Sequence, residues 1–407
     1  MTETVLSFGD TTAPPSGASC RPSDSFKLLC TACNLGPEQV ARLENHNWNA
    51  SDFDWTEFLH AAEHHGVLAL VAKNLTTHAS DLPSQIEQSL RLTYAGSLRR
   101  NLWFAAELMR ILRHFAQEQV SALPYKGPVL AQAAYGDLAL RTFSDLDLLI
   151  SPRDFHGARQ ALAEIGYVPS QELTPAIEHF SLRTGYERSF DGAAGKNILE
   201  LQWSLLPHFY AVDLKSTGFQ VSDLLARSSR IALDAASSEN TIPCLSPEDS
   251  LIILCLHAAK HLWSRLIWVA DIAQTLRVPD LDLSLVTSRA KSLGIARILG
   301  VSLWLAKNVL GAPIPQSPRE LLPSEQESAL GQEYASRLAA GVAYDFESPE
   351  YFRHVLKLRE RPTDQLRYLW RLATTAGLGD LSAVELPEPM FPLYRVVRAA
   401  RLLRKLT

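Results

Sequence analysis

The sequence predicts an α+β protein in which a small mixed-sheet core is flanked by helical regions at both ends. Three observations support this fold class. Apolar residues recur at helical spacing before residue 120 and again after residue 245. Between these limits, short runs alternate apolar and polar residues, which is typical of strands. A glycine-containing turn, "DGAAGK", separates two of these runs and predicts a hairpin.

The chain of 407 residues is expected to divide into four segments. Residues 1–25 are rich in Ser, Thr, Pro and Gly and predict a disordered tail. We expect a helical region over 26–119, an α+β core over 120–245 and a C-terminal helical domain over 246–407.

The first helical region contains a clear helix start and a long amphipathic helix. Asp54 is expected to be an N-cap, with Glu57 three residues later in a capping-box pattern. The run "LRRNLWFAAELMRILRHFAQEQ" then keeps helical spacing over many turns and predicts one long helix.

The core is expected to begin with a short apolar strand in "VSALPYKG". A helix follows in "PVLAQAAYG", then a strand in "DLDLLI" and a helix that ends at Gly166, its C′ glycine. The remaining two strands form the predicted hairpin, "HFSLRTGYERSF" and "NILELQWSLL".

Helical spacing returns after the core. The run "SPEDSLIILCLHAAKHLWSRLIWVADIAQTL", residues 246–276, predicts a helix that Ser246 caps and whose first turn carries Glu248 and Asp249. The proline-containing segment 311–325 predicts a loop. The last run, "YRVVRAARLLRKL", predicts a basic amphipathic helix. This helix could contact a partner or a membrane, or it could pack by its apolar side as an ordinary surface helix.

Composition excludes several classes of function. The net charge is −5, so we expect no binding of long nucleic acid, which needs a basic stripe. No run of about 20 uncharged apolar residues predicts a transmembrane helix. We find no signal-peptide pattern, and the five scattered cysteines do not suggest a disulfide framework, so a cytoplasmic location is expected.

Two carboxylates stand one residue apart in the apolar run "DLDLLI". Alternation along a strand places Asp145 and Asp147 on the same face. Glu200 lies in "ILELQW" and would join them if the two strands are neighbours. Carboxylates held this close repel each other, and a divalent cation would relieve the repulsion. The sequence therefore predicts a metal and catalytic site at Asp145, Asp147 and Glu200, with Mg²⁺ as the expected ion and Mn²⁺ as the alternative.

A phosphate-binding element is expected just upstream. Gly127 stands between a strand and a helix start, where the backbone can approach a phosphate and the helix offers free N–H groups. Lys126 adds a positive charge. Arg141 could reach the same triphosphate, or it could form a salt bridge with a neighbouring carboxylate at the rim.

These residues carry a family resemblance. The stretch "YKGPVLAQAAYGDLALRTFSDLDLLI" resembles the signature of the uncharacterised bacterial nucleotidyltransferase family, which belongs to the DNA polymerase beta-like nucleotidyltransferase superfamily. The resemblance extends over roughly residues 26–407. It implies that Asp145 and Asp147 are the metal-binding pair, that Glu200 is the third carboxylate and that Gly127 is the glycine of the Gly-Ser motif. It also implies a role in polysaccharide or natural-product biosynthesis.

Three features depart from the pattern. One is the gap from Gly127 to Asp145, which is longer than in minimal nucleotidyltransferases. Pro128 replaces the superfamily serine, so its hydroxyl is missing and Lys126 is the expected substitute. Family members often have a histidine between the third carboxylate and a tryptophan, whereas this chain has Gln202 before Trp203.

The run "LHAAKHLWSRLIWVADIA" carries a polar stripe formed by His257, Lys260, His261 and Ser264 at helical spacing. One interpretation is that the stripe closes over the nucleotide, with Lys260 on a phosphate and Trp263 on a base or ring. The other is a polar cluster between helices in which Asp271 pairs with Lys260 or a histidine.

The leading hypothesis is an enzyme that binds an NTP, with ATP expected first, and transfers NMP to an unknown acceptor with release of pyrophosphate. The second is a non-catalytic nucleotide-binding or regulatory protein on the same fold. The third is a helical interaction protein whose Asp-x-Asp pattern is only a solvated strand edge.

Overall fold

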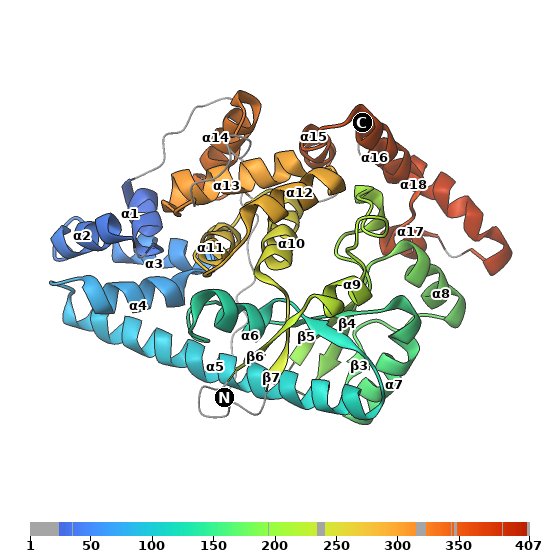
Figure 1. Ribbon diagram of the computed structural model, residues 1–407, viewed down its shortest axis with the longest axis horizontal. Helices are drawn as coiled ribbons and strands as arrows, with labels where there is room; N and C mark the ends of the chain where they lie inside the picture. The colour runs from blue at the N-terminus through green and yellow to red at the C-terminus, as the bar shows by residue number, and fades with distance from the viewer. Residues whose placement is uncertain are drawn as a thin grey trace.

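The structure is a computed structural model that describes residues 24–34, 36–193, 195–233, 241–314, 323–342, 344–345, 348–384 and 386–404 (Figure 1). It is an α+β fold with a mixed sheet and helical regions at both ends, as predicted. In Figure 1 the N-terminal helices lie at the left, α5 runs along the lower edge and the last helices of the chain lie at the upper right.

The N-terminal region contains five helices. Asp54 caps the third of them by accepting a hydrogen bond from the Glu57 N–H at 2.9 Å, which confirms the predicted helix start. The predicted long helix is α5, which has 34 residues. The predicted tail lies outside the described residues except for its last two, which begin α1. The bounds are α1 (Asp24–Ala32), α2 (Pro37–Asn45), α3 (Trp55–His64), α4 (Leu68–His78) and α5 (Ser84–Gln117).

The core holds a five-stranded sheet in the order β1-β2-β5-β4-β3. Strands β2 and β5 are parallel, and the other neighbours are antiparallel, so the sheet is mixed. A separate two-stranded sheet, β6-β7, follows. The strands are β1 (Ala122–Pro124), β2 (Leu146–Ile150), β3 (Val168–Pro169), β4 (Glu187–Gly192), β5 (Gly195–Gln202), β6 (Ser229–Ala232) and β7 (Thr241–Cys244).

Short helical elements connect these strands. The helix predicted to end at Gly166 is α7, and this glycine has φ +87° as a C′ residue requires. The elements are α6 (Gly127–Leu130), the π-helix η1 (Ala131–Tyr135), the 3₁₀ helix η2 (Pro152–Asp154), α7 (Phe155–Glu164), α8 (Pro175–Thr184), the 3₁₀ helix η3 (His208–Tyr210) and α9 (Val221–Ala226).

The C-terminal region is helical throughout its described part. Ser246 caps α10 by accepting from the Asp249 N–H at 3.2 Å, as predicted. Part of the predicted loop 311–325 lies outside the described residues. The helices are α10 (Pro247–Lys260), α11 (Leu266–Thr275), α12 (Leu283–Leu293), α13 (Ala296–Leu310), α14 (Glu325–Ala339), α15 (Pro349–Lys357), α16 (Pro362–Thr374), α17 (Leu378–Ala383), the 3₁₀ helix η5 (Glu388–Leu393) and α18 (Tyr394–Arg404).

The two faces of β2 belong to different cores. Leu146, Leu148 and Ile150 pack with side chains of α5 and α7. Leu149 points the other way, into the larger core that includes α10 and α11. The second face is therefore covered by the C-terminal helices, and Asp147, two residues before Leu149, shares that face.

Two predictions about local structure were wrong. The first half of the expected strand "HFSLRTGYERSF" is the end of α8, because Thr174 caps that helix and Pro175 occupies its first turn. The helix expected to run through residues 246–276 is broken after Lys260. Leu262 and Trp263 both have φ of +49°, so the chain turns there before α11 begins.

Candidate active site

The three predicted carboxylates come together on one face of the sheet. In the parallel pairing of β2 and β5, Asp147 lies directly opposite Glu200. Asp145, just before β2, shares the face of Asp147 because side chains two residues apart in a strand point the same way. One carboxylate oxygen of each residue lies within 4.8 Å of the other two.

Burial and mutual repulsion change the acidity of these groups. Burial, and then the charge of Asp147, raise the pKa of Asp145 to about 6. Burial, followed by Glu187 and Asp147, raises the pKa of Glu200 to about 7. Since oxygen ligands are what hard divalent cations prefer, this donor set suits such an ion. The same set has an unfavourable electrostatic energy without one.

Lys126 contacts the acidic cluster directly. Its Nζ donates a hydrogen bond to Oδ1 of Asp147 at 2.8 Å, and both side chains are buried. Burial alone would lower the pKa of Lys126, but the nearby carboxylates, Asp147 first, raise it. Lys126 precedes Gly127, which opens α6 with φ +57°. This conformation favours glycine, and it brings the backbone close to the carbonyl of Asp145.

Gln202 contacts three carboxylates from β5, where it lies two residues after Glu200 on the same face. The Nε2 group of Gln202 lies 2.9 Å from Glu200, 3.2 Å from Asp147 and 3.2 Å from Glu187. Its Oε1 accepts a hydrogen bond from the hydroxyl of Tyr125 at 2.5 Å. The amide is thereby fixed with its donor side toward the acids.

Glu187 is a fourth carboxylate that the sequence analysis did not identify. It lies in β4 opposite Gln202, so it shares the face of Glu200. Burial raises its pKa, while Lys260 opposes that shift. The alternation of Glu187 and Ser189 along the strand was the available signal, but it identifies a site residue only after the register with β5 is known.

Arg141 forms its ion pair with a buried carboxylate outside the cluster, that of Asp271. Its Nε and one terminal nitrogen donate to the two oxygens of Asp271 at 2.9 and 3.0 Å. Tyr135 donates to the same carboxylate at 2.7 Å. Asp271 therefore pairs with Arg141, rather than with Lys260 or a histidine as one interpretation held. This ion pair joins the core to α11.

The predicted polar stripe is only partly preserved. Lys260 donates to the hydroxyl of Tyr186 at 3.3 Å, and burial lowers its pKa. The rings of His257 and His261 lie 4.8 Å apart, and burial holds the pKa of both well below the usual value. Trp263 is fully buried and donates to the hydroxyl of Ser302, which contradicts the interpretation that it contacts a base or ring.

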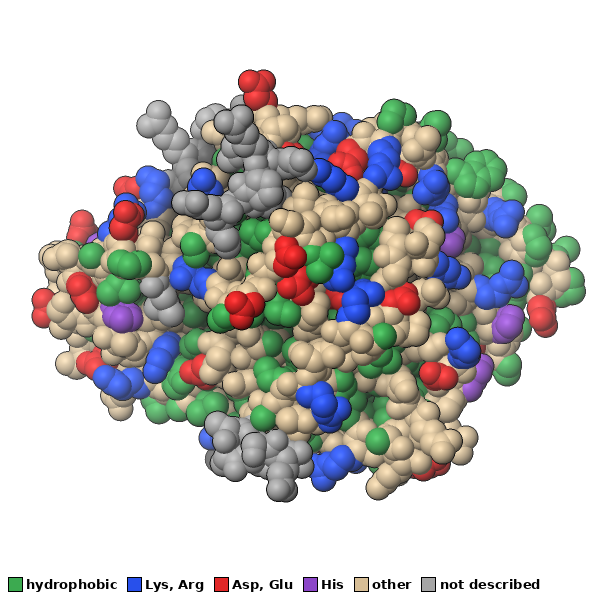
Figure 2. Space-filling model, viewed as in Figure 1, with side chains coloured by type: hydrophobic (Ala, Val, Ile, Leu, Met, Phe, Trp, Pro, Cys, Tyr) green, Lys and Arg blue, Asp and Glu red, His purple; other side chains and the backbone are tan. Residues whose placement is uncertain are grey.

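Two arginines of the C-terminal basic helix form ion pairs within the protein. Arg398 is buried, and both it and Arg401 form ion pairs with the buried Asp380 of α17. Val396 and Leu403 remain exposed. Acidic and basic side chains are interspersed on the face drawn in Figure 2. Lys405, part of the predicted helix, lies outside the described residues.

Comparison with known proteins identifies the class of this chain. Residues 51–311, more than half of the sequence, match the family described as "Uncharacterised nucleotidyltransferase". The chain belongs to this nucleotidyltransferase family, as its sequence signature predicted. Neither the curated proteins nor the solved structures contain a match to the chain. In the part of the chain that the structure describes, no helix is long and apolar enough to cross a membrane.

Proposed function

We propose that this protein transfers NMP from an NTP to an acceptor hydroxyl or phosphate with release of pyrophosphate. The observation that carries the proposal is the convergence of Asp145, Asp147 and Glu200 within 4.8 Å beside the buried Lys126. Nucleotidyl transfer needs oxygen ligands for divalent ions next to a phosphate-binding element. The three carboxylates would supply the first and Lys126, which contacts Asp147, would supply the second.

The carboxylates would hold Mg²⁺, or Mn²⁺ as an alternative. A bound divalent ion supplies neutralisation of the charge that develops on the phosphates. Lys126 and the backbone N–H groups that open α6 would bind the triphosphate, at the position where Gly127 leaves no side chain in the way. Lys260 would approach a phosphate from the opposite side, from α10.

Arg141 is better suited to positioning than to phosphate contact. Its guanidinium is buried and already makes two hydrogen bonds to Asp271. We infer that this pair fixes the orientation of the C-terminal helices over the acidic face, which places Lys260 near the cluster. The triphosphate charge would then be balanced mainly by Lys126, Lys260 and the metal.

ATP is the first NTP to test, and a cytoplasmic location agrees with the buried thiols of Cys30, Cys33, Cys244 and Cys255. A role in polysaccharide or natural-product biosynthesis follows from the family resemblance alone.

Two observations favour a second function, non-catalytic nucleotide binding. The Lys126–Asp147 ion pair neutralises one carboxylate without a metal, and Pro128 supplies no hydroxyl for a phosphate. A protein of this kind would bind NTP and metal without releasing pyrophosphate.

A pyrophosphate-release assay separates the two functions. The four NTPs are incubated with Mg²⁺ and a panel of sugars, sugar phosphates, amino alcohols and peptides, and the Asp145→Asn/Asp147→Asn variant serves as the control. Release that requires an acceptor and is lost in the variant supports nucleotidyl transfer. Metal-dependent NTP binding without release for any acceptor in the panel supports the second function.

A further inference from the structure

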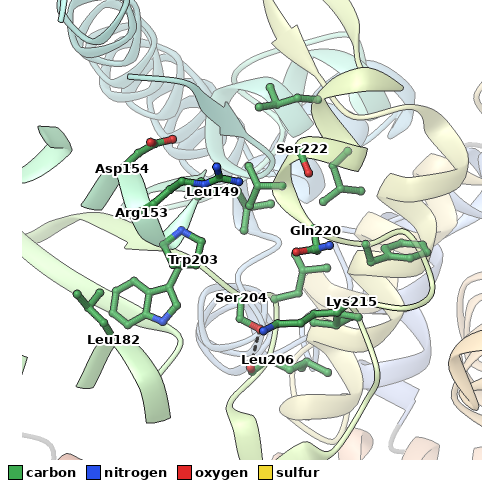
Figure 3. Close-up of a pocket in the computed structure, with 18 of the residues that line it drawn as sticks. Leu149, Arg153, Asp154, Leu182, Trp203, Ser204, Leu206, Lys215, Gln220 and Ser222 are labelled. Carbon is green, nitrogen blue, oxygen red and sulfur yellow. Dashed lines mark hydrogen bonds between the residues drawn. The ribbon is translucent and has the colours of Figure 1, made fainter. Parts of the chain in front are cut away.

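A cavity opens at the carboxyl ends of β2 and β5 (Figure 3). Its volume is about 510 Å³, which is ample for a small molecule. Leu149 and the turn after β2 form one wall, the segment that follows β5 forms a second, and α9 with the turn before it forms a third.

Three cations line this cavity without a partner among the described residues. They are Arg153, Arg183 and Lys215, and none of them forms an ion pair or a side-chain hydrogen bond within the described part of the chain. In Figure 3, Arg153 and Lys215 extend toward the middle of the cavity from opposite sides. One carboxylate, that of Asp154, also lines it, so the cavity keeps an excess of positive charge.

The rest of the lining suits a ligand that carries a ring or several hydroxyl groups. Trp203 and Leu182 provide apolar surface on one side. Ser204, Gln220 and Ser222 provide hydroxyl and amide groups on the other. The lining therefore combines an apolar wall, hydrogen-bonding groups and unpaired cations, as sites for small anionic ligands do.

The cavity lies on the side of the carboxylates opposite to the expected phosphate site. Lys126 and Gly127 stand beside the amino end of β2, because β1 runs antiparallel to it. Leu149 lines the cavity and follows Asp147 by two residues on the same face, a separation of about 7 Å along a strand. The carboxylates thus lie between the cavity and the expected phosphate site at Lys126 and Gly127. An acceptor and a nucleotide would have to meet there.

We propose that this cavity binds the acceptor of the transfer reaction and that this acceptor carries a phosphate or carboxylate group. The proposal rests on the nucleotidyl-transfer function proposed above. Arg153, Arg183 and Lys215 hold the anionic group, and a hydroxyl of the acceptor faces the carboxylates. The hydroxyl oxygen forms a bond to the α-phosphorus, the bond from that phosphorus to the bridging oxygen breaks, pyrophosphate leaves, and the hydroxyl proton passes to solvent.

Binding of simple anions tests the site first. Phenyl phosphate, benzoate and the neutral benzyl alcohol are titrated calorimetrically into wild type and into Arg153→Gln/Lys215→Gln. The matched control is Arg99→Gln/Arg100→Gln, which removes two exposed cations from α5. We expect one or both anions to bind wild type and the control equally. The cavity variant should lose at least about 10-fold in affinity, since each charged hydrogen bond contributes roughly 1.5–3 kcal/mol.

Equal affinity in the cavity variant, no anion binding to wild type, or equal binding of benzyl alcohol would overturn the assignment. Transfer assays with glucose 1-phosphate, glucuronate and glucose then distinguish a phosphate from a carboxylate. Transfer to glucose at the same rate as to both anions would also contradict it.

The same samples are titrated with each of the four NTPs and Mg²⁺. If wild type binds none of them while it binds the anions, the proposed function and the acceptor assignment both fall. If NTP binding persists but anion binding is unchanged in the cavity variant, only the acceptor assignment falls.

Discussion

The Nζ of Lys126 lies 2.8 Å from Oδ1 of Asp147, and the two buried groups form an ion pair in the centre of the acidic face. The lysine therefore offsets part of the repulsion among the carboxylates. In the proposed function, a triphosphate that arrives with a metal would offer the lysine a second anionic partner and would offer Asp147 a second cation. The ion pair would then link nucleotide binding to metal binding through one side chain.

Removal of the lysine should destabilise the protein without metal. The substitution Lys126→Met leaves the buried Asp147 without its cation, and loss of one partner of a buried pair costs roughly 3 kcal/mol. Added Mg²⁺ should restore part of this loss, which urea unfolding with and without the ion would measure. The exposed Lys196→Met is the control and should change the free energy of unfolding by less than about 0.5 kcal/mol. A Lys126→Met variant as stable as wild type would exclude a stabilising ion pair.

The raised pKa of Glu200 predicts a specific pH dependence of stability. The pKa of Glu200 is about 7 in the folded protein, compared with 4.5 for an ordinary glutamate, so its carboxyl group stays protonated to a higher pH. The folded state therefore binds more protons, and this group's contribution to stability falls as pH rises through that range. Glu200→Gln should match wild type at about pH 4 and exceed its free energy of unfolding at about pH 8, on the order of 2 kcal/mol. Glu63→Gln, at an exposed position, is the control; a pH-independent effect of Glu200→Gln would refute the prediction.

The Arg141–Asp271 pair should couple the core to α11. Asp271→Asn leaves a buried guanidinium with weaker partners and should cost about 3 kcal/mol. The double variant Arg141→Met/Asp271→Asn should be less destabilised than the sum of the single variants by about 1 kcal/mol or more. Additive single effects, measured by chemical unfolding, would show that the pair contributes no coupling.

Glu187 and Glu200 should differ in metal binding although both lie near Gln202. Only Glu200 belongs to the group of three carboxylates within 4.8 Å of one another. Glu200→Gln should weaken Mn²⁺ binding by more than about 10-fold, whereas Glu187→Gln acts through Gln202 and should have a smaller effect. Electron paramagnetic resonance of free Mn²⁺ measures both affinities. A larger loss in Glu187→Gln would reassign the third metal ligand.

The acidic cluster could be predicted from sequence because it depends on the simplest rule of strands. Residues i and i+2 share a face, so Asp145 and Asp147 had to project together. Glu200 needed one more assumption, that its strand is a neighbour, and the pairing of Asp147 with Glu200 satisfies it. The α+β fold class followed similarly from the change of hydrophobic period at the two ends of the core.

Contacts between distant segments could not be predicted in the same way. Arg141 and Asp271 are 130 residues apart, and no local pattern indicates that they meet. The burial of Trp263 depends on a turn formed by residues with positive φ, which interrupts a sequence with continuous helical spacing. The prediction of a strand at the end of α8 was wrong for a different reason. Thr174 and Pro175 are helix-start signals in the sequence, but the apparent alternation of apolar and polar residues that follows them favoured a strand.

Calorimetric titration of ATP with Mg²⁺ into wild type and Asp145→Asn/Asp147→Asn would show whether the acidic cluster holds the metal that binds the nucleotide. Omission of Mg²⁺ is the first control, and Lys196→Met is the second. If the carboxylates hold the metal that binds the triphosphate, wild type and Lys196→Met will bind ATP only with Mg²⁺, and the double variant will lose at least about 10-fold in affinity. Binding that is equally tight in the double variant, or equally tight without Mg²⁺, would contradict the account.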